Sequence, residues 1–189
     1  MFRSCMGIEI PGGIMKRVGF WLMVVMAAGL LGGCVTLFGG KDRAIAVIAP
    51  TQGYQVKGTV WLEQRGDRVM VIADLQGLPP DSEHGFHVHE RGDCSAPDAS
   101  SAGDHFKHGV QPHGHFKASS HHAGDLPNLK ADSRGVAKVS FEVDGISVWP
   151  GPSSMIGRAL VVTLDPDDYR TQPDGNSGAR IGCGVIGLQ

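Results

Sequence analysis

The chain has 189 residues, of which 41% are hydrophobic and 19% charged, and its formal net charge is −2. This length suits one domain with a sizeable core, and the high hydrophobic content with little net charge excludes an intrinsically disordered chain. The near balance of acidic and basic residues gives no compositional support for nucleic-acid binding. All nine histidines lie between His84 and His122, so we expect the chemistry of the protein in that segment.

The N-terminus has the pattern of an export signal. Lys16 and Arg17 precede an apolar run at 18–31, which is followed by two glycines and Cys34. A basic region, an apolar region too short to span a membrane and small residues before a cleavage site are typical of a secretory signal peptide at 1–33. With its cysteine, the segment resembles the signal of a bacterial lipoprotein, in which that cysteine becomes the lipid-modified first residue. The alternative is an ordinary signal peptide with a chance cysteine.

Further boundaries follow from this signal. Met15 is a more usual start for it, so residues 1–14 are expected to be an over-extended gene start. Residues 34–43 would then form a lipid-anchored tether, and 44–189 a single folded domain. Val35 is not the aspartate-type signal for retention in the inner membrane, so we expect the protein in the periplasm, anchored by lipid to the outer membrane.

Two cysteines remain in the domain after cleavage, Cys94 and Cys183. An even pair in an exported chain predicts a disulfide, because the compartment is oxidising. The bond would close a loop of about 90 residues and contribute roughly 4 kcal/mol to stability by the chain-entropy argument.

The domain contains short apolar runs bounded by glycine, proline and aspartate, which is typical of strands joined by turns. No segment of twelve or more residues has a helical period. The pattern predicts an all-β sandwich or barrel. The expected strands are 44–49, 54–64, 68–75, 85–89, 136–143, 158–163 and 181–186.

Two segments lack this strand pattern, 90–132 and 164–179. The first is rich in Gly, Ser, His, Asp and Pro, and the second carries four aspartates. Loops this long inside a compact domain usually carry function or need a cross-link that orders them.

A metal site is the chemistry that these residues favour. His87 and His89 stand two positions apart in an expected strand, so their side chains share one face. A pair of exposed structural histidines is the alternative interpretation. Three further histidines and one aspartate form a plausible closed tetrahedral zinc set, which favours a structural metal. They are His105, His113, His122 and Asp125.

Several motifs in this order resemble those of the bacterial copper–zinc superoxide dismutases, and the resemblance extends from about Ala44 to the C-terminus. That family implies an eight-stranded Greek-key β-barrel with the metal site under two long loops. The motifs are 85–90 (GFHVHE), 92–94 (GDC), 102–106 (AGDHF), 122–126 (HAGDL), 157–162 (GRALVV) and 178–187 (GARIGCGVIG).

The resemblance also implies roles for single residues. His87 and His89 match copper ligands, and His105 matches the histidine that bridges copper and zinc. Asp167 matches a carboxylate that links a copper-ligand histidine to a zinc-ligand histidine, expected here to be His87 and His113. Arg180 matches the arginine that attracts the anionic substrate, superoxide. The remaining matches are the zinc ligands His113, His122 and Asp125 and the disulfide Cys94–Cys183.

One position departs from the family pattern. The strand that begins with GRALVV continues with a histidine in the family, the fourth copper ligand, whereas this chain has Thr163. No histidine follows His122, so a shift of register cannot supply another. A neutral hydroxyl is a poor ligand for soft cuprous ion. We therefore expect zinc to bind as a structural ion, and copper (Cu²⁺/Cu⁺) to be held more weakly, with reduced dismutation.

Other polar residues of the metal loop have a simpler interpretation. His108, His115 and His121 could turn towards the copper, but solvated loop residues are the expectation. His84 matches a structural position of the family. Asp104 places a carboxylate next to a ligand, where it could oppose the capture of an anion.

Two functions remain open on the sequence. One is an exported superoxide dismutase with an incomplete copper site. The other is a non-catalytic, metal-binding, dismutase-like lipoprotein that has lost redox turnover. A zinc hydrolase is disfavoured, because the zinc set is full and leaves no open position. The sequence leaves both monomer and homodimer open.

Overall fold

The computed structural model describes residues 42–189. The predicted signal, Cys34 and most of the tether lie outside the described residues. Within 42–189, no helix is long and apolar enough to cross a membrane. The strands of this part are β1 (Arg43–Pro50), β2 (Lys57–Arg65), β3 (Arg68–Gln76), β4 (Glu83–His84), β5 (Phe86–His89), β6 (Leu129–Lys130), β7 (Val136–Val143), β8 (Ala159–Thr163) and β9 (Arg180–Leu188), with one 3-10 turn, η1 (Ser100–Ala102).

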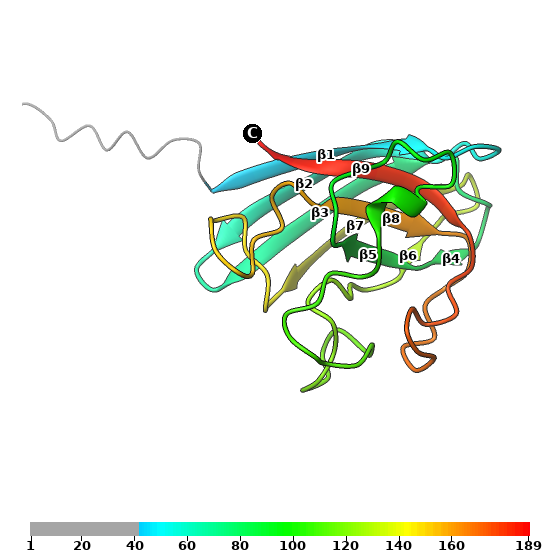
Figure 1. The fold of residues 1–189 in the computed structure, drawn as a ribbon. Helices are drawn as coiled ribbons and strands as arrows, with labels where there is room; N and C mark the ends of the chain where they lie inside the picture. The colour runs from blue at the N-terminus through cyan, green and yellow to red at the C-terminus, as the bar shows by residue number, and fades with distance from the viewer. Residues whose placement is uncertain (1–41) are drawn as a thin grey trace, which may run out of the picture. The chain divides into compact units, whose positions relative to one another are not determined.

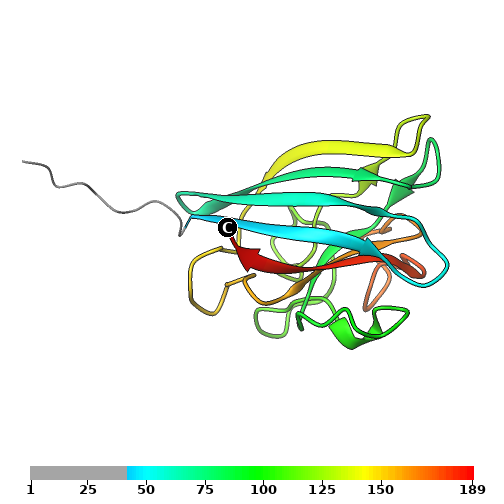
Figure 2. The same ribbon diagram turned by 90° about the horizontal axis from the view of Figure 1, so that it is seen from above.

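Seven strands form one antiparallel sheet in the order β5-β8-β9-β1-β2-β3-β7, and β4 pairs with β6 (Figure 1). Seen from above, β9, β1, β2, β3 and β7 lie side by side (Figure 2). Gly85 alone separates β4 from β5, and β6 lies against β7, so the short pair joins the two ends of the curled sheet. The connections from β3 to β4 and from β7 to β8 cross between the edges of the sheet, as in a Greek key. The all-β barrel or sandwich is confirmed.

Alternation of side chains explains why these segments form strands around a core. In β3, Val69, Val71, Ala73 and Leu75 are buried, while the residues between them are exposed or half-buried. Successive side chains of a strand point to opposite faces, so one apolar face of each strand lines the barrel interior. The resulting core is continuous across the sheet. It provides a rigid frame from which the metal loops extend on one side (Figure 1).

All seven expected strands are present, with ends that differ by a few residues. The long segment 90–132 is not wholly without regular structure, because it contains η1 and β6. β6 and its partner β4 have two residues each, too few to show an apolar period. Their pairing is Glu83 with Lys130 and His84 with Leu129.

Candidate metal centre

Strand β5 carries two histidines of the candidate centre, and the loop that supplies the other ligands pairs with this strand. His87 and His89 are buried on this strand, two residues apart. The following loop returns along the strand: the Phe106 N–H donates to the Val88 carbonyl at 2.8 Å, and the Val88 N–H donates to the Gly124 carbonyl at 2.9 Å. His105 is thereby paired with His89, and Asp125 with His87. Two parts of the long loop therefore continue the sheet at its β5 edge.

Two glycines allow the close approaches of this arrangement. A Cβ on Gly124 would collide with the carbonyl oxygen of Val88, so only glycine lets the loop lie against β5. Gly175 has a positive φ of 69°, and a Cβ there would collide with the carboxylate of Asp167. Side chains at these two positions would displace the loops that carry the site.

Four potential ligand atoms lie close together in the loop beside β5, one each from His105, His113, His122 and Asp125. The Nδ1 atoms of His105, His113 and His122 lie 3.1, 3.0 and 3.6 Å from Oδ1 of Asp125. A tetrahedral zinc ion with bonds of about 2.0–2.1 Å has ligand atoms about 3.3 Å apart. The four side chains are buried and form one potential metal cluster. Their spacing therefore fits a zinc ion.

The hydrogen bonds of His113 also indicate a cation between its ring and Asp125. Its Nε2–H donates to Oδ1 of Asp167 at 2.8 Å, so in the neutral ring Nδ1 carries a lone pair. That lone pair faces the carboxylate oxygen of Asp125 at 3.0 Å. Two lone pairs repel each other at this distance unless a cation lies between them. In the metal-free protein this cation is a proton, which a zinc ion would replace.

A second cluster, His87, His89 and His105, shares His105 with the first. The His89 Nδ1–H donates to the Gly103 carbonyl at 2.9 Å, and the His87 Nε2–H donates to Asp167 at 2.9 Å. The opposite nitrogens, His89 Nε2 and His87 Nδ1, are buried and have no hydrogen-bond partner. Unpaired imidazole lone pairs in a buried site fit a transition metal such as copper.

Asp167 lies between the two clusters. Its Oδ2 accepts from His87 and its Oδ1 accepts from His113, which are the two histidines expected from the sequence. Asn128 holds this residue in place, because its side chain bonds both the N–H and the carbonyl of Asp167 at 3.0 Å. Such a carboxylate fixes the tautomer and the orientation of both rings.

The pKa values reflect these contacts. Burial lowers the pKa of His105 to about 4, and the neighbouring His87 adds to the effect. Burial also lowers the pKa of His89 well below its usual value. For His113, burial is outweighed by hydrogen bonds to Asp125 and Asp167, which raise its pKa to about 9. At neutral pH the rings of His89 and His105 are thus neutral and able to bind a metal, while His113 holds the proton that zinc would displace.

Thr163 lines a small cavity of about 50 Å³ beside this cluster, together with His89, His105 and Arg180. Its hydroxyl donates to the carbonyl of Asp165 at 3.2 Å, so the proton of Thr163 is used within the protein. The structure thus places a buried neutral hydroxyl at the edge of the three-histidine cluster. The family resemblance implies a fourth imidazole ligand at this position.

Arg180 is fixed by the loop that the disulfide anchors. Its guanidinium donates to the carbonyls of Ala99 and Gly103, at 2.7 Å each. The predicted disulfide is confirmed: Cys94 and Cys183 are bonded with a Cα–Cα distance of 5.8 Å. It joins this loop to β9, the strand that begins with Arg180. The same Gly103 carbonyl accepts from His89, so one backbone atom connects the arginine to the histidine cluster.

The other histidines lie outside both clusters. His84 is buried, and its ring bonds Ser82 and the carbonyl of Thr163. His108 and His115 are exposed, and His121 is half-buried. Sequence reasoning missed Asn128 and also Gln172, whose side-chain amide bonds the N–H and the carbonyl of His113. A lone amide in a loop carries no sequence signal for such a role.

Comparisons with known proteins give a consistent result. The family model for copper/zinc superoxide dismutase matches residues 56–186. A protein of Aquifex aeolicus named superoxide dismutase [Cu-Zn] 2 is 36% identical over 167 residues, covering 84% of this chain and 97% of the relative. A superoxide dismutase [Cu-Zn] of Paramecium bursaria Chlorella virus 1 is 40% identical over 151 residues, covering 77% and 79%.

Among solved structures, the crystal structure of the clock protein EA4 matches with a TM-score of 0.72 and 38% identity, covering 80% of this chain and 98% of that one. The family model accounts for more than half of the sequence, and the relatives align along most of their own length. The chain belongs to the copper/zinc superoxide dismutase family.

Proposed function

We propose that this protein is an exported superoxide dismutase that works with three copper imidazoles and turns over more slowly than a four-imidazole enzyme. Two superoxide anions and two protons would give dioxygen and hydrogen peroxide. Copper held by His87, His89 and His105 would supply the reversible one-electron exchange. The observation that carries the proposal is the pair of buried, unpartnered nitrogens on His87 and His89, which face a shared cluster with His105.

The remaining residues support this chemistry without exchanging electrons. A zinc ion at His105, His113, His122 and Asp125 would fix the ring of His105. Asp167 fixes the protonated nitrogens of His87 and His113, so that their other nitrogens remain free for metal. Arg180 provides a fixed positive charge at the cavity, which can hold a small anion near the copper ligands.

The reduced turnover is proposed because of Thr163. Cuprous ion is soft and prefers sulfur or imidazole ligands, so the neutral hydroxyl stabilises it poorly. Copper bound by fewer imidazoles would be lost more readily in its reduced state. Water can complete the coordination of cupric ion, so loading is retained in part.

Thr163 also favours a second candidate function. A dismutase-like protein that binds zinc and copper without turnover would need the clusters but not the fourth imidazole. Against it, the contacts of Asp167 and the position of Arg180 are retained. These contacts serve an anion and a redox metal more directly than they serve metal storage.

One experiment separates the two functions. The protein is loaded with copper and zinc, the metal content is measured, and superoxide removal is assayed beside Thr163→His. We expect measurable activity in the natural protein, and an increase on the order of tenfold in the variant, because an added imidazole ligand stabilises bound copper. An inactive natural protein with an active variant would support the binding protein. Equal high activity in both would mean that the fourth imidazole is dispensable.

Export and lipid attachment at Cys34 are part of the proposal and rest on the sequence pattern. The mature protein is expected in the periplasm, on the outer membrane. Mass spectrometry of its N-terminus should find acylated Cys34 as the first residue, and Cys34→Ala should remain unprocessed. An unmodified N-terminus after cleavage elsewhere would indicate an ordinary signal peptide.

A further inference from the structure

The cavity beside the candidate copper ligands has more acidic than basic groups around it. Asp104, Asp174 and Arg180 line it, together with His89 and Thr163. Its charged lining therefore contains two carboxylates and one guanidinium. A superoxide channel that relied on Arg180 alone would present a net positive charge to solvent, which this lining does not.

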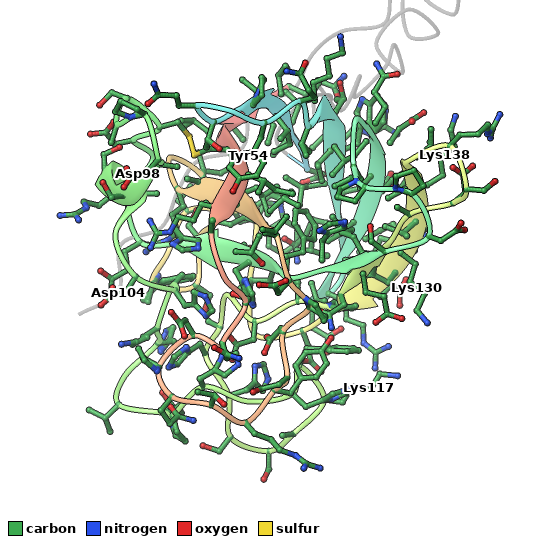
Figure 3. All side chains as sticks on the ribbon, turned by 90° about the vertical axis from the view of Figure 1, so that its right-hand side faces the viewer. Tyr54, Asp98, Asp104, Lys117, Lys130 and Lys138 are labelled. Atoms are coloured by element: carbon green, nitrogen blue, oxygen red, sulfur yellow. A yellow bond between two sulfur atoms is a disulfide. The ribbon has the colours of Figure 1, made fainter. Side chains whose placement is uncertain are left out.

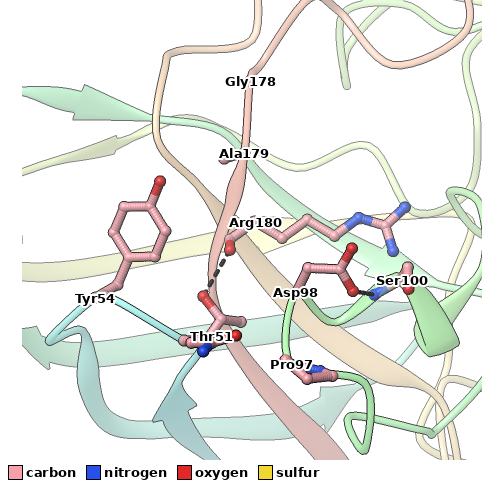
Figure 4. Close-up of a pocket in the computed structure, with 9 residues that line it drawn as sticks. Thr51, Tyr54, Pro97, Asp98, Ser100, Gly178, Ala179 and Arg180 are labelled. Atoms are coloured by element: carbon pink, nitrogen blue, oxygen red, sulfur yellow. Dashed lines mark hydrogen bonds between the residues drawn. The ribbon is translucent and has the colours of Figure 1, made fainter.

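A third carboxylate, that of Asp98, lies on the other side of Arg180, in a neighbouring cavity. A larger cavity of about 410 Å³ shares Gly178 and Arg180 with the small one and is lined by Asp98. Figure 4 shows the Asp98 carboxylate beside the arginine side chain, with its hydrogen bond to the Ser100 N–H at 3.0 Å. The guanidinium is thus flanked by acidic groups on both cavities, while its own close contacts are with backbone carbonyls.

The electrostatic balance at Arg180 agrees with this geometry. Burial lowers the pKa of its guanidinium, whereas the charge of Asp104, followed by those of Asp98 and Asp174, raises it. The charge of Arg91 acts in the opposite direction and lowers the pKa of Arg180. Figure 3 shows Asp98 and Asp104 on one side of the molecule and Lys117, Lys130 and Lys138 on the other. The labelled lysines therefore do not offset the acidic groups at the cavity.

We infer that the mouth of the candidate copper site favours cations over anions, because the three carboxylates around it, Asp98, Asp104 and Asp174, outnumber the two guanidinium groups of Arg91 and Arg180. This inference rests on the proposed copper site and adds a property to it. The mouth would speed the entry of copper ions to the unpartnered Nε2 of His89, a residue that is only 2% exposed, and it would slow the entry of superoxide. Charges at the mouth of a cavity change the local concentration of an approaching ion and thereby its rate of entry.

Two measurements on the zinc-loaded protein test the inference, one for the entry of a cation and one for the binding of an anion. The first is the rate constant for uptake of cupric ion, followed by stopped-flow absorbance. The second is the affinity of the copper-loaded protein for azide, a small anion, followed by its charge-transfer absorption. Both are measured for the natural protein, Asp104→Asn, Asp174→Asn and the double variant. In Asp174→Asn the amide oxygen can still accept from the Asn176 N–H, as the carboxylate of Asp174 does at 3.3 Å.

We expect the double variant to take up copper about tenfold more slowly and to bind azide about tenfold more tightly, with about threefold from each single variant. Raising the ionic strength from about 0.01 M to about 0.15 M should weaken azide binding more in the double variant than in the natural protein, because salt screens the attraction of the anion to Arg180 and the bound metal ions, which Asp104 and Asp174 offset only in the natural protein. The matched control is Asp67→Asn with Asp144→Asn, which removes the same charge at exposed turns outside both cavities.

The inference is overturned if the double variant leaves either copper uptake or azide affinity within twofold of the control, or if the natural protein takes up no copper. Dismutation assayed on the same samples keeps the two claims apart. If both measurements move as expected without dismutation, the proposed activity is wrong and the cation-selective mouth stands. If the protein dismutates superoxide and its azide affinity falls with salt as steeply as that of the double variant, the cation-selective mouth is wrong and the proposed activity stands.

Discussion

Thr163 can affect copper binding in two ways, through the absence of an imidazole at this position and through its own hydroxyl. The hydroxyl donates to the carbonyl of Asp165, so it is engaged within the protein. We expect Thr163→Ala to keep copper affinity within about twofold, since a neutral hydroxyl contributes little to copper binding. The variant should lose about 1 kcal/mol of stability with the hydrogen bond. Chelator competition and urea unfolding measure the two effects; loss of copper from Thr163→Ala would identify the hydroxyl as a ligand.

His113 allows a prediction about pH. Its pKa is raised to about 9, since the hydrogen bonds to Asp125 and Asp167 outweigh its burial. The metal-free protein therefore holds a proton there at neutral pH, and zinc must displace it. We expect zinc binding to release roughly one proton at a pH of about 7.5, and its affinity to rise with pH up to about 9 and then level off.

Calorimetry of zinc binding in two buffers of different ionisation enthalpy counts the released protons. Asp167→Asn removes one of the two carboxylates and should reduce the release, whereas Asp132→Asn, in an exposed turn, should not. The sign for stability follows from the same shift. A histidine with a raised pKa stabilises the metal-free fold below its unfolded value of about 6.5, and this stabilisation is lost as pH rises through about 9. An affinity that does not depend on pH between about 7 and about 9 would contradict the assignment.

Among the elements, the disulfide connects the loop after β5 to β9. Cys94 and Cys183 are 89 residues apart, and the loop beyond Cys94 supplies the two carbonyls that hold Arg180. We expect Cys94→Ser with Cys183→Ala to lose roughly 4 kcal/mol of stability. Arg180 should also become more mobile, so that dismutation falls further than metal content does. Urea unfolding, metal analysis and the superoxide assay measure these effects, with the reduced natural protein as control.

If the double cysteine variant kept the activity per bound copper of the natural protein, the disulfide would act on stability alone. That outcome would mean that hydrogen bonds to Ala99 and Gly103 are sufficient to position the guanidinium.

The elements also show which parts of the structure could be predicted from sequence. Seven strands were predictable because apolar residues alternate along them or form a continuous buried run. β4 and β6 were not, since a two-residue strand has no period and depends on a partner far along the chain. The fold therefore follows from local patterns except where pairing alone defines a strand.

The residues of the candidate site also divide into those that the sequence pattern predicts and those that it does not. His87 and His89 were predictable as a pair from the strand period, and their shared face is present in the structure. The return of the loop along β5, which brings in His105 and Asp125, is made by backbone hydrogen bonds that every residue can form. The family resemblance suggested those residues; the sequence pattern alone could not have paired them. The acidic lining around Arg180 combines residues 98, 104 and 174 from two loops, so only the structure unites it.

On the scale of the whole molecule, the barrel and the metal loops have different sources of stability. The barrel interior is a continuous apolar core, and hydrophobic burial of this kind needs no metal. The loop between Asp104 and Leu126 has few apolar residues beyond Phe106 in that core. Its described contacts centre on the zinc cluster, where Asp125 Oδ2 also accepts from the N–H groups of Gly114 and His122. A metal ion would therefore stabilise the loop more than the barrel.

This difference predicts the response to metal removal. After chelation we expect the β-sheet circular dichroism to persist at room temperature, while a protease cleaves between residues 107 and 121, where the side chains are mostly exposed. Zinc alone should restore protection, because the candidate zinc ligands His105 and His122 flank that segment, and copper alone should not. A free zinc concentration about a hundredfold above its dissociation constant would add about 2.7 kcal/mol to the stability of the whole domain. Asp125→Asn should behave as the metal-free protein at every zinc concentration that protects the natural one, and Asp132→Asn should not. Global unfolding on chelation, with loss of the sheet signal, would instead show that the barrel depends on the metal loops for its own stability.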